Sequence, residues 1–227
     1  MITWEPEKAE VQVWKIQLDL NPSTLARLQA LLSKDELERA SCFRFLDDYK
    51  KFIFNRGATR LILGQTLKLN PSELVFHYGK FGKPMLKHST LQFNLSHSDS
   101  LALLAISLAA PVGIDIERNK KEEPSWDLVR SVLTEIEARR YQKLLPEERP
   151  NSFLKVFTRK EAYLKALGLG LSVSLRDFYS GFEPGELEIC APQEEKFCLH
   201  NLALGRDYIG ALALRSKERF IVKDWTP

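Results

Sequence analysis

The amino-acid sequence predicts an α+β fold built from two similar halves. Strand-like alternation of apolar and polar residues and helix-like spacing both recur along the chain. In addition, residues 99–117 (DSLALLAISLAAPVGIDIE) align without a gap with residues 207–225 (DYIGALALRSKERFIVKDW), and each segment is typical of a strand–turn–strand unit. The second copy lacks the two acids of the first, Asp115 and Glu117. We therefore expect two related halves, of which one carries the chemistry.

The first half is predicted to begin with a strand and continue with a long helical region. Residues 11–20 (VQVWKIQLDL) alternate apolar and polar side chains, as a half-buried strand does. Residues 33–69 favour helix, with Ser33 as the N-cap and Glu36 completing a capping box, and an Asn-Pro pair stops the pattern. Residues 77–86 (HYGKFGKPML) contain glycine and proline and indicate a loop.

Strand patterns follow, and then a second helical region. Residues 91–98 (LQFNLSHS) indicate a short strand that opens into a loop, while LALLAISL and VGIDIE indicate two buried strands joined at 109–111. Helical patterns cover 126–145 and 150–167, and Gly168 is a natural C-cap. The remainder, 172–227, favours short strands and turns.

Composition excludes several classes of protein. Of the 227 residues, 44% are hydrophobic and 28% charged, which indicates a folded globule, and a net charge of +3 does not by itself indicate a nucleic-acid partner. Three cysteines and four histidines without ligand spacing indicate neither disulfides nor a zinc site. The charged N-terminus, MITWEPEKAE, does not resemble a signal peptide, and no apolar run is long enough for a membrane span. We expect a cytoplasmic protein.

Asp115 and Glu117 stand at the end of a strand rich in branched apolar residues. Residues two apart on a strand project to the same face, so the two carboxylates would repel each other and resist desolvation. A bound Mg²⁺ relieves both problems, because this ion prefers oxygen ligands. An exposed strand end with two solvated acids explains the same pattern, and both interpretations stay open at this point.

Other polar residues also allow a local and a functional interpretation. Glu161 and Lys165 lie four apart on a predicted helix, as in an ordinary surface ion pair or as part of a site. Lys83, between a glycine and a proline, is either a solvated turn lysine or a phosphate contact. Ser96 lacks the G-x-S-x-G setting of a serine hydrolase, and His97 alone is either structural or functional.

The order of these motifs along the chain is more specific than any one of them. From about Ser33 to Leu171 it resembles the surfactin-type (Sfp-type) 4′-phosphopantetheinyl transferases, and cyanobacterial members in particular. The matching motifs are G-K-P, F-N-L-S-H-S, G-I-D-I-E and K-E-A-x-x-K-x-x-G-x-G-L.

The resemblance implies a fold and a reaction. Each pseudo-symmetric half should be a small antiparallel sheet packed on a long helix, with the active site in the cleft between the halves. Residues 1–110 should anchor coenzyme A (CoA), and residues 111–227 should hold the metal. The reaction moves 4′-phosphopantetheine from CoA to a serine of an apo acyl or peptidyl carrier protein and releases adenosine 3′,5′-bisphosphate.

The resemblance also assigns the charged residues. Asp115, Glu117 and Glu161 should hold Mg²⁺ on the pyrophosphate of CoA. Glu161 is the first candidate for the base that activates the carrier serine, and Lys165 should stabilise the leaving phosphate or help to move a proton. The residues expected to contact CoA are Arg39, Lys51, Lys83, Pro84, Ser96 and His97.

The chain departs from the family pattern at two positions. Glu36 replaces a lysine that the best-known relative has near the 3′-phosphate of CoA, so Lys34 or Arg44 would have to substitute. Phe157 stands where tryptophan is common, and this exchange of one packing aromatic for another should have a mild effect.

The expected partner is a carrier protein that presents an acidic helix. We expect a mixed apolar and basic docking surface on residues 128–145, while an amphipathic helix that only covers the sheet explains the same pattern. The residues proposed for docking are Val132, Leu133, Arg139, Arg140 and Lys143. Two halves of one site on one chain suggest a monomer, without nucleic-acid or membrane partners.

Two other functions remain as alternatives at this stage. A Mg²⁺-dependent nuclease or phosphohydrolase could also use D-x-E with a distant glutamate, but this reading leaves the G-K-P and S-H-S motifs unexplained. A CoA-binding adaptor without catalysis is the second alternative, against which stand the three acids and Lys165.

Overall fold

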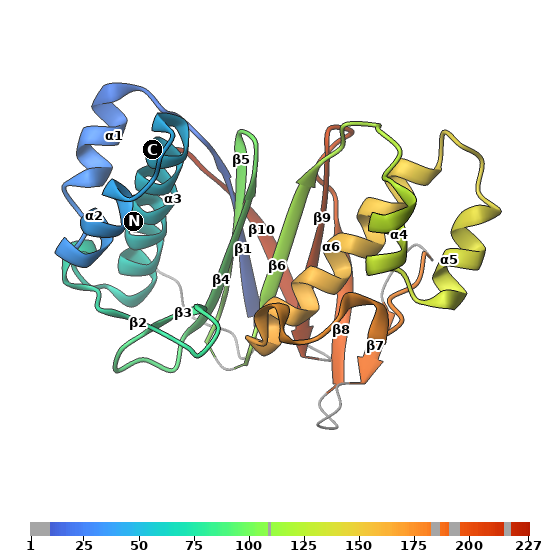
Figure 1. Ribbon diagram of the computed structural model, residues 1–227. Helices are drawn as coiled ribbons and strands as arrows, with labels where there is room; N and C mark the ends of the chain where they lie inside the picture. Colours follow the sequence, from blue (N-terminus) through green and yellow to red (C-terminus); the bar gives the residue numbers. More distant parts are fainter. Residues whose placement is uncertain (1–9, 109, 183–186, 191–195, 216–218) are drawn as a thin grey trace.

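The computed structural model describes residues 10–108, 110–182, 187–190, 196–215 and 219–227. Two four-stranded sheets stand between two groups of helices, as Figure 1 shows. The first sheet has the strand order β10-β1-β5-β4 and consists of β1 (Glu10–Gln17), β4 (Gln92–Ser98), β5 (Leu101–Ser107) and β10 (Arg219–Trp225). The second sheet has the order β6-β9-β8-β7 and consists of β6 (Gly113–Arg118), β7 (Leu187–Cys190), β8 (Lys196–Leu202) and β9 (Tyr208–Arg215).

The two halves repeat one arrangement. In each, a first strand is followed by a long helix and two further strands, and the sheet order is β1-β5-β4 in one half and β6-β9-β8 in the other. The neighbouring strands in these triplets are antiparallel. β10 then returns from the second half and pairs in parallel with β1, with Val222 opposite Val13. The predicted α+β fold with two similar halves is confirmed.

The predicted helical region of the first half is confirmed as two helices. They are α2 (Lys34–Ser41) and α3 (Leu46–Leu67), preceded by α1 (Pro22–Gln29). The capping box is present, with the Ser33 N–H donating to Glu36 Oε2 over 3.0 Å. α3 ends at Lys68, whose left-handed backbone (φ 57°) is followed by a short 3₁₀ turn, Pro71–Glu73. Proline cannot continue a helix, so the sequence signal and the end of α3 agree.

The second half has two short helices and one long one, which are α4 (Trp126–Val132), α5 (Glu135–Gln142) and α6 (Arg149–Leu167). α5 begins with a second capping box, from Thr134 to Glu137. α6 ends at Gly168 in the left-handed region (φ 67°), as predicted, followed by 3₁₀ turns at Gly170–Ser172 and Leu175–Asp177. Among the described residues, no helix has both the length and the apolar character that a membrane span requires.

Three apolar layers hold these elements together. α3 packs on one face of the first sheet, where Phe54 and Ile62 join Ile16 and Leu104. The opposite face of this sheet packs against the second sheet through residues such as Val13, Leu103, Ile114 and Leu212. α6 covers the outer face of the second sheet, where Ala162 and Leu164 join Leu199 and Ala211. The two sheets therefore face each other at the centre, and each has a long helix on its outer face.

Three predictions about local structure are wrong. Residues 77–86 are mostly a hairpin, β2 (Phe76–Tyr78) and β3 (Pro84–Leu86), rather than a loop. β4 continues through Ser98, so Ser96 and His97 lie on a strand. β5 and β6 belong to different sheets, as do β9 and β10, so neither repeated unit is a hairpin. Residues 1–9, where a signal peptide was excluded, and Ala109, in the expected turn, lie outside the described residues.

Candidate active site

The two halves meet along a seam between β4 and β6. Alternate side chains of β4 face β6 and bind it: Asn94 Oδ1 accepts from the Ile114 N–H (2.8 Å), and Ser98 Oγ accepts from the Arg118 N–H (3.0 Å). Between them, Ser96 Oγ donates to Asp115 Oδ1 over 2.9 Å. Side chains thus replace the backbone ladder that two neighbouring strands would form, and they leave room for a site at the seam.

β6 can approach α6 closely because it begins with Gly113. A Cβ atom at this position would lie 2.0 Å from the Ala162 carbonyl oxygen and 2.3 Å from the Ala166 nitrogen. These distances exclude every other residue without a shift of the backbone. The glycine of the G-I-D-I-E motif therefore allows α6 to bring its charged residues next to the acids of β6.

Asp115 is the most deeply buried acid of the seam. The residue is 3% exposed, and Oδ1 accepts from Lys165 Nζ (2.6 Å) as well as from Ser96. Oδ2 is buried and has no hydrogen-bond partner among the described residues. Burial raises the pKa of Asp115, and the Lys165 ammonium only partly offsets this.

Glu117 and Glu161 complete a group of three carboxylates around one cavity. Both are half-buried, and Ser98 Oγ donates to Glu117 Oε2 over 3.1 Å. Burial raises the pKa of both glutamates, and the charge of Asp115 raises it further. The cavity measures about 310 Å³ and is lined by Leu95, Ser96, His97, Asp115, Glu117, Phe157, Glu161 and Lys165. The structure thus brings all three predicted metal ligands to one place, together with Lys165.

The side chains of these residues are of the type that binds a divalent cation, but they do not form a complete coordination site. Among the described residues, no group of three or more Asp, Glu, His or Cys side chains is arranged so that it could hold a metal ion. The fit therefore rests on chemistry: three carboxylates line one cavity, and the buried Asp115 Oδ2 lacks a partner. Lys165 Nζ supplies the positive charge that Asp115 contacts in this structure.

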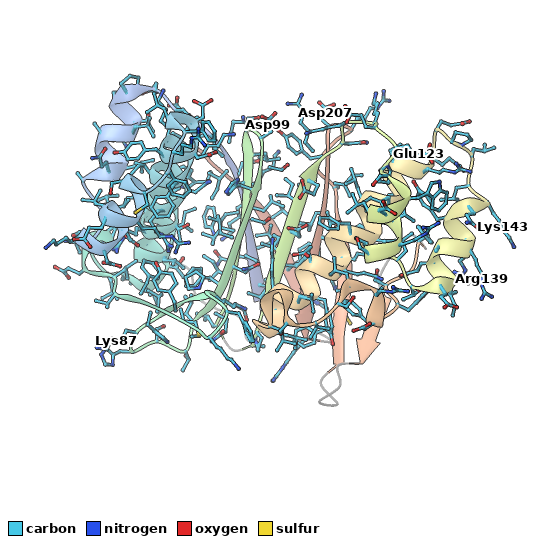
Figure 2. All side chains as sticks on the ribbon, in the orientation of Figure 1. Lys87, Asp99, Glu123, Arg139, Lys143 and Asp207 are labelled. Carbon is cyan, nitrogen blue, oxygen red and sulfur yellow. The ribbon has the colours of Figure 1, made fainter. Side chains whose placement is uncertain are left out.

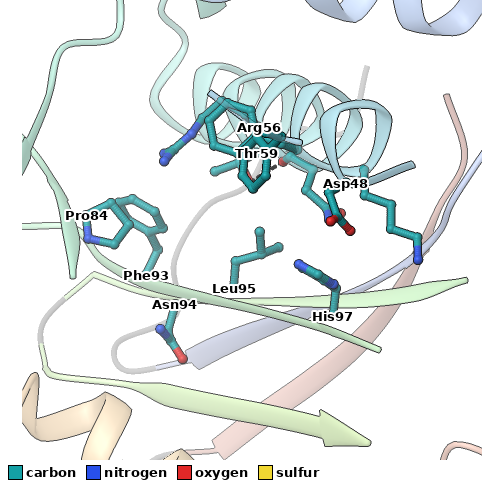
Figure 3. A pocket seen from close by; sticks show the side chains of 12 residues that line it. Asp48, Arg56, Thr59, Pro84, Phe93, Asn94, Leu95 and His97 are labelled. Carbon is teal, nitrogen blue, oxygen red and sulfur yellow. Dashed lines mark hydrogen bonds between the residues drawn. The ribbon is translucent and has the colours of Figure 1, made fainter. Parts of the chain in front are cut away.

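A second cavity adjoins the first and lies between α3 and β4. It measures about 240 Å³, and Figure 3 shows Asp48, Arg56 and Thr59 reaching from α3 toward Phe93, Leu95 and His97 of β4. Its other lining residues are Phe43, Lys51, Phe52, Asn55, Pro84 and Asn94. Leu95 and His97 line both cavities, so the two lie next to each other along β4.

His97 lines both cavities, the one with the three carboxylates and the one with Lys51. Burial lowers the pKa of its imidazole, and the positive charges of Lys51 and Lys165 lower it further, while Asp48 opposes them. A histidine with a pKa below its usual 6.5 is mainly neutral at pH 7. His97 can therefore donate one hydrogen bond to a phosphate at neutral pH without carrying a full charge.

Lys83 is used differently from what its motif suggests. Its ammonium donates to three backbone carbonyls of the second half, those of Val112 (3.2 Å), Lys165 (2.7 Å) and Ala166 (3.1 Å). Burial lowers its pKa to about 8. Lys83 thus connects the β2–β3 hairpin to the C-terminal end of α6. Its contact with a CoA phosphate stays a prediction.

Lys51 and Arg39, two basic residues expected to contact CoA, differ in their position relative to the cavity. Lys51 lines the cavity beside His97, whereas the Arg39 guanidinium stacks over Phe52 and Tyr78 and is not among the lining residues. Glu36, the departure from the family pattern, is 1% exposed and forms ion pairs with Arg60 (2.7 Å) and Arg56 (3.3 Å). Glu36 is therefore a structural residue of the first half.

Neither candidate substitute for the missing lysine lies in the cavity wall. Lys34 pairs with Glu38 across one turn of α2, and the Arg44 guanidinium stacks over the exposed ring of Phe45. Phe157 does line the cavity of the acids, and its ring stacks on Phe153. It packs as expected of an aromatic that replaces tryptophan.

The expected docking segment is partly wrong. Val132 and Leu133 are 2% and 1% exposed and belong to an apolar core, so they cannot contact a partner. The basic residues do reach the surface: Figure 2 shows Arg139 and Lys143 at the end of the molecule opposite Lys87. Arg139 pairs with Glu135, and Arg140 Nη1 donates to the Tyr179 hydroxyl over 2.6 Å. The apolar faces of α4 and α5 cover α6 instead.

Sequence reasoning missed one group of residues that builds the site and one that anchors α6. The first is Asn94 and Ser98, whose alternation with apolar residues in F-N-L-S-H-S is itself the signal of a strand with a polar face. The second is the fully buried pair of Lys160 and Glu137, joined over 2.6 Å beneath α6. The capping-box pattern from Thr134 to Glu137 could have indicated the glutamate.

Comparison with known proteins assigns the family. The model described as "4′-phosphopantetheinyl transferase superfamily" matches residues 111–213, and the model described as "4′-phosphopantetheinyl transferase, N-terminal" matches residues 3–109. The 4′-phosphopantetheinyl transferase HetI of Nostoc sp. is 38% identical over 181 residues, which cover 75% of this chain and 76% of the relative. The chain belongs to the 4′-phosphopantetheinyl transferase superfamily.

Other relatives agree with this assignment. The transferase psf-1 of Bacillus pumilus is 30% identical over 77% of this chain and 75% of its own length. The transferase Sfp of Bacillus subtilis is 25% identical over 83% of this chain and 84% of its own length. The predicted family and its cyanobacterial character are confirmed. The chain is thus an enzyme that transfers phosphopantetheine to carrier proteins.

Proposed function

We propose that the protein transfers the 4′-phosphopantetheine of CoA to a serine of apo acyl or peptidyl carrier proteins in a Mg²⁺-dependent reaction. The observation that carries this proposal is the joint lining of one cavity by Asp115, Glu117, Glu161 and Lys165 at the seam of the two halves. The adjoining cavity, with Lys51 and His97, offers positive charge and a hydrogen-bond donor for the phosphates of CoA. Both walls come from one chain, which supports action as a monomer.

Asp115, Glu117 and Glu161 are the residues that would hold Mg²⁺, and the ion would neutralise charge on the pyrophosphate oxygens. Ser96 orients Asp115, because its hydroxyl donates to the same oxygen that Lys165 contacts. Glu161 is half-buried with a raised pKa, so it is a stronger base than an exposed glutamate and suits the carrier serine proton.

These groups account for the bond that forms, the bond that breaks and the proton that moves. The serine oxygen forms a bond to the phosphorus that carries pantetheine, and its proton passes to the Glu161 carboxylate. The bond from this phosphorus to the bridging oxygen breaks, and adenosine 3′,5′-bisphosphate leaves with that oxygen. Lys165 stabilises the negative charge that develops there. Positioning and charge neutralisation thus supply the acceleration.

A mass measurement tests the proposal. The full-length protein is incubated with CoA, Mg²⁺ and an apo carrier protein, and the carrier is then weighed. We expect a gain of one phosphopantetheine, which chelation of the metal or Asp115→Ala abolishes. An unchanged carrier mass, or the release of inorganic phosphate from CoA without a carrier, contradicts the proposal.

A further inference from the structure

Asn55 presents a buried amide without partners at the wall of the cavity between α3 and β4. The residue is 4% exposed and lines this cavity. Both polar atoms of its side chain, Oδ1 and Nδ2, are buried and have no hydrogen-bond partner among the described residues. A buried amide normally satisfies both atoms, because an unpaired donor or acceptor destabilises the fold. This exception calls for a group that binds there.

The position of Asn55 on α3 supports a role toward the cavity. Asp48, Lys51, Phe52, Asn55 and Thr59 follow one another at intervals of one, three and four residues, and all of them line the cavity. Residues at this spacing form one stripe on a helix. A different stripe, with Phe54, Ala58 and Ile62, packs into the core. Asn55 thus belongs to the stripe that lines the cavity, although its two polar atoms have no hydrogen-bond partner in the described part of the chain.

The chemistry of a primary amide narrows the choice of partner. Nδ2 donates hydrogen bonds and Oδ1 accepts them, so a complete partner must offer an acceptor and a donor side by side. A phosphate group offers acceptors and leaves Oδ1 unpaired. The adenine base offers its exocyclic amine as a donor next to a ring nitrogen as an acceptor, and asparagine pairs with this edge in a bidentate manner. The aromatic side chains of Phe43, Phe52 and Phe93, which line the same cavity, suit a flat base.

We propose that Asn55 recognises the adenine base of CoA through its exocyclic amine and the adjacent ring nitrogen. This inference rests on the proposed use of CoA and assigns the selectivity for its base to one residue. Lys51, one turn before Asn55 in the same wall, then supplies positive charge for the phosphates of the nucleotide. The amide remains unpaired until the base binds, so Asn55 favours the complex with an adenine nucleotide over complexes with other bases.

A substrate analogue tests this assignment directly. In 6-desamino-CoA, hydrogen replaces the exocyclic amine, so Oδ1 of Asn55 loses its donor and no rotation of the amide restores it. For the wild-type protein we expect kcat/KM to be about 10-fold to 100-fold lower with the analogue than with CoA, mainly through KM. In Asn55→Leu the two substrates should have similar kcat/KM values. Thr59→Val is the matched control, since it removes a polar atom from the same wall and should keep the preference for CoA.

Each outcome of this experiment bears on the inference. Equal use of both substrates by the wild-type protein, or the same preference in Asn55→Leu, would overturn it, whereas a lack of transfer from CoA itself would overturn the proposed function instead. A second measurement does not depend on catalysis. Asn55→Leu should melt at a higher temperature than the wild-type protein without ligand, and CoA should stabilise it less. A lower melting temperature would show that the amide has a structural partner, which contradicts the inference.

Discussion

Lys165 Nζ lies 2.6 Å from Asp115 Oδ1, and Ser96 of the opposite half contacts both of them, with Oγ 3.1 Å from the lysine nitrogen and 2.9 Å from the same carboxylate oxygen. These contacts join β4, β6 and α6 at one point. They balance one oxygen of Asp115 and leave the other without a partner. The side chains of the protein therefore hold one oxygen of Asp115 in place, and the second oxygen is the one left for the proposed cation.

Asp115→Asn should lower the transferase activity without lowering the stability of the fold. The amide has the same shape but no charge, so transfer should fall at least about 100-fold. Burial raises the pKa of Asp115, so the fold favours the protonated acid and loses this contribution as the pH rises through the raised value. Urea unfolding at pH 7 should therefore show that the variant is no less stable than the wild-type protein. Asp127→Asn, at a fully solvated acid, is the control and should change neither property.

Mg²⁺ should stabilise the wild-type protein by mass action. An ion that binds only the folded state raises the melting temperature as its concentration rises. We expect this increase in thermal unfolding at pH 7, and we expect Asp115→Asn to abolish it, while Asp127→Asn keeps it. If Mg²⁺ changed the melting temperatures of all three proteins equally, the three carboxylates would not be its site.

The pH dependence of stability should reveal the buried ammonium of Lys83. Its folded pKa of about 8 lies below the ordinary value of 10.5, so burial disfavours the charged form at neutral pH. This penalty disappears as the pH rises from about 8 to 10.5, because the folded lysine then loses its proton first. Relative to Lys83→Met, the wild-type protein should thus gain up to about 3 kcal/mol of unfolding free energy over this interval. A constant difference in urea unfolding between pH 7 and pH 10 would contradict the assignment.

Removing one charge of the buried ion pair between Lys160 and Glu137 should destabilise the fold. Lys160 donates to Glu137 and to the carbonyls of Val132 and Leu175, and Glu137 also accepts from the N–H groups of Ser180 and Gly181. Lys160→Met should lower the unfolding free energy by about 3–5 kcal/mol, because it leaves a buried carboxylate uncompensated. The double variant with Glu137→Gln should recover part of this loss in a double-mutant cycle. Additive losses would mean that the two charges do not interact.

The exposed basic residues of α5 provide a test of carrier docking. Exchange of Arg139 and Arg140 for glutamate should raise KM for the carrier severalfold and leave KM for CoA unchanged, since opposite charges steer association. Lys87→Glu makes a similar charge reversal at the opposite end of the molecule and should have no such effect. An unchanged carrier KM in the α5 variant would exclude this surface.

The sequence could predict the elements that local patterns define. The capping box at Ser33, the proline that follows α3 and Gly168 after α6 each act on the backbone within a few residues, so the helices could be located. The same holds for Asp115 and Glu117, which share a cavity because residues two apart on a strand share a face.

Contacts between distant parts of the chain could not be predicted in this way. The carbonyls that bind Lys83 lie 29 to 83 residues away, and no local pattern connects them to the hairpin. The burial of Val132 and Leu133 likewise depends on α6 packing over them, whereas the same residues on an isolated helix would form an exposed apolar stripe. Tertiary packing, rather than local propensity, decides both cases.

The parallel pairing of β10 with β1 has a consequence for how this molecule can be divided. A cut between the halves, near residue 110, would remove the outer strand of the first sheet from its own fragment, since this strand comes from the very end of the chain. The N-terminal fragment would then expose unpaired backbone N–H and C=O groups along β1, which promotes aggregation. We therefore expect the two fragments to regain the native fold only when they are expressed together.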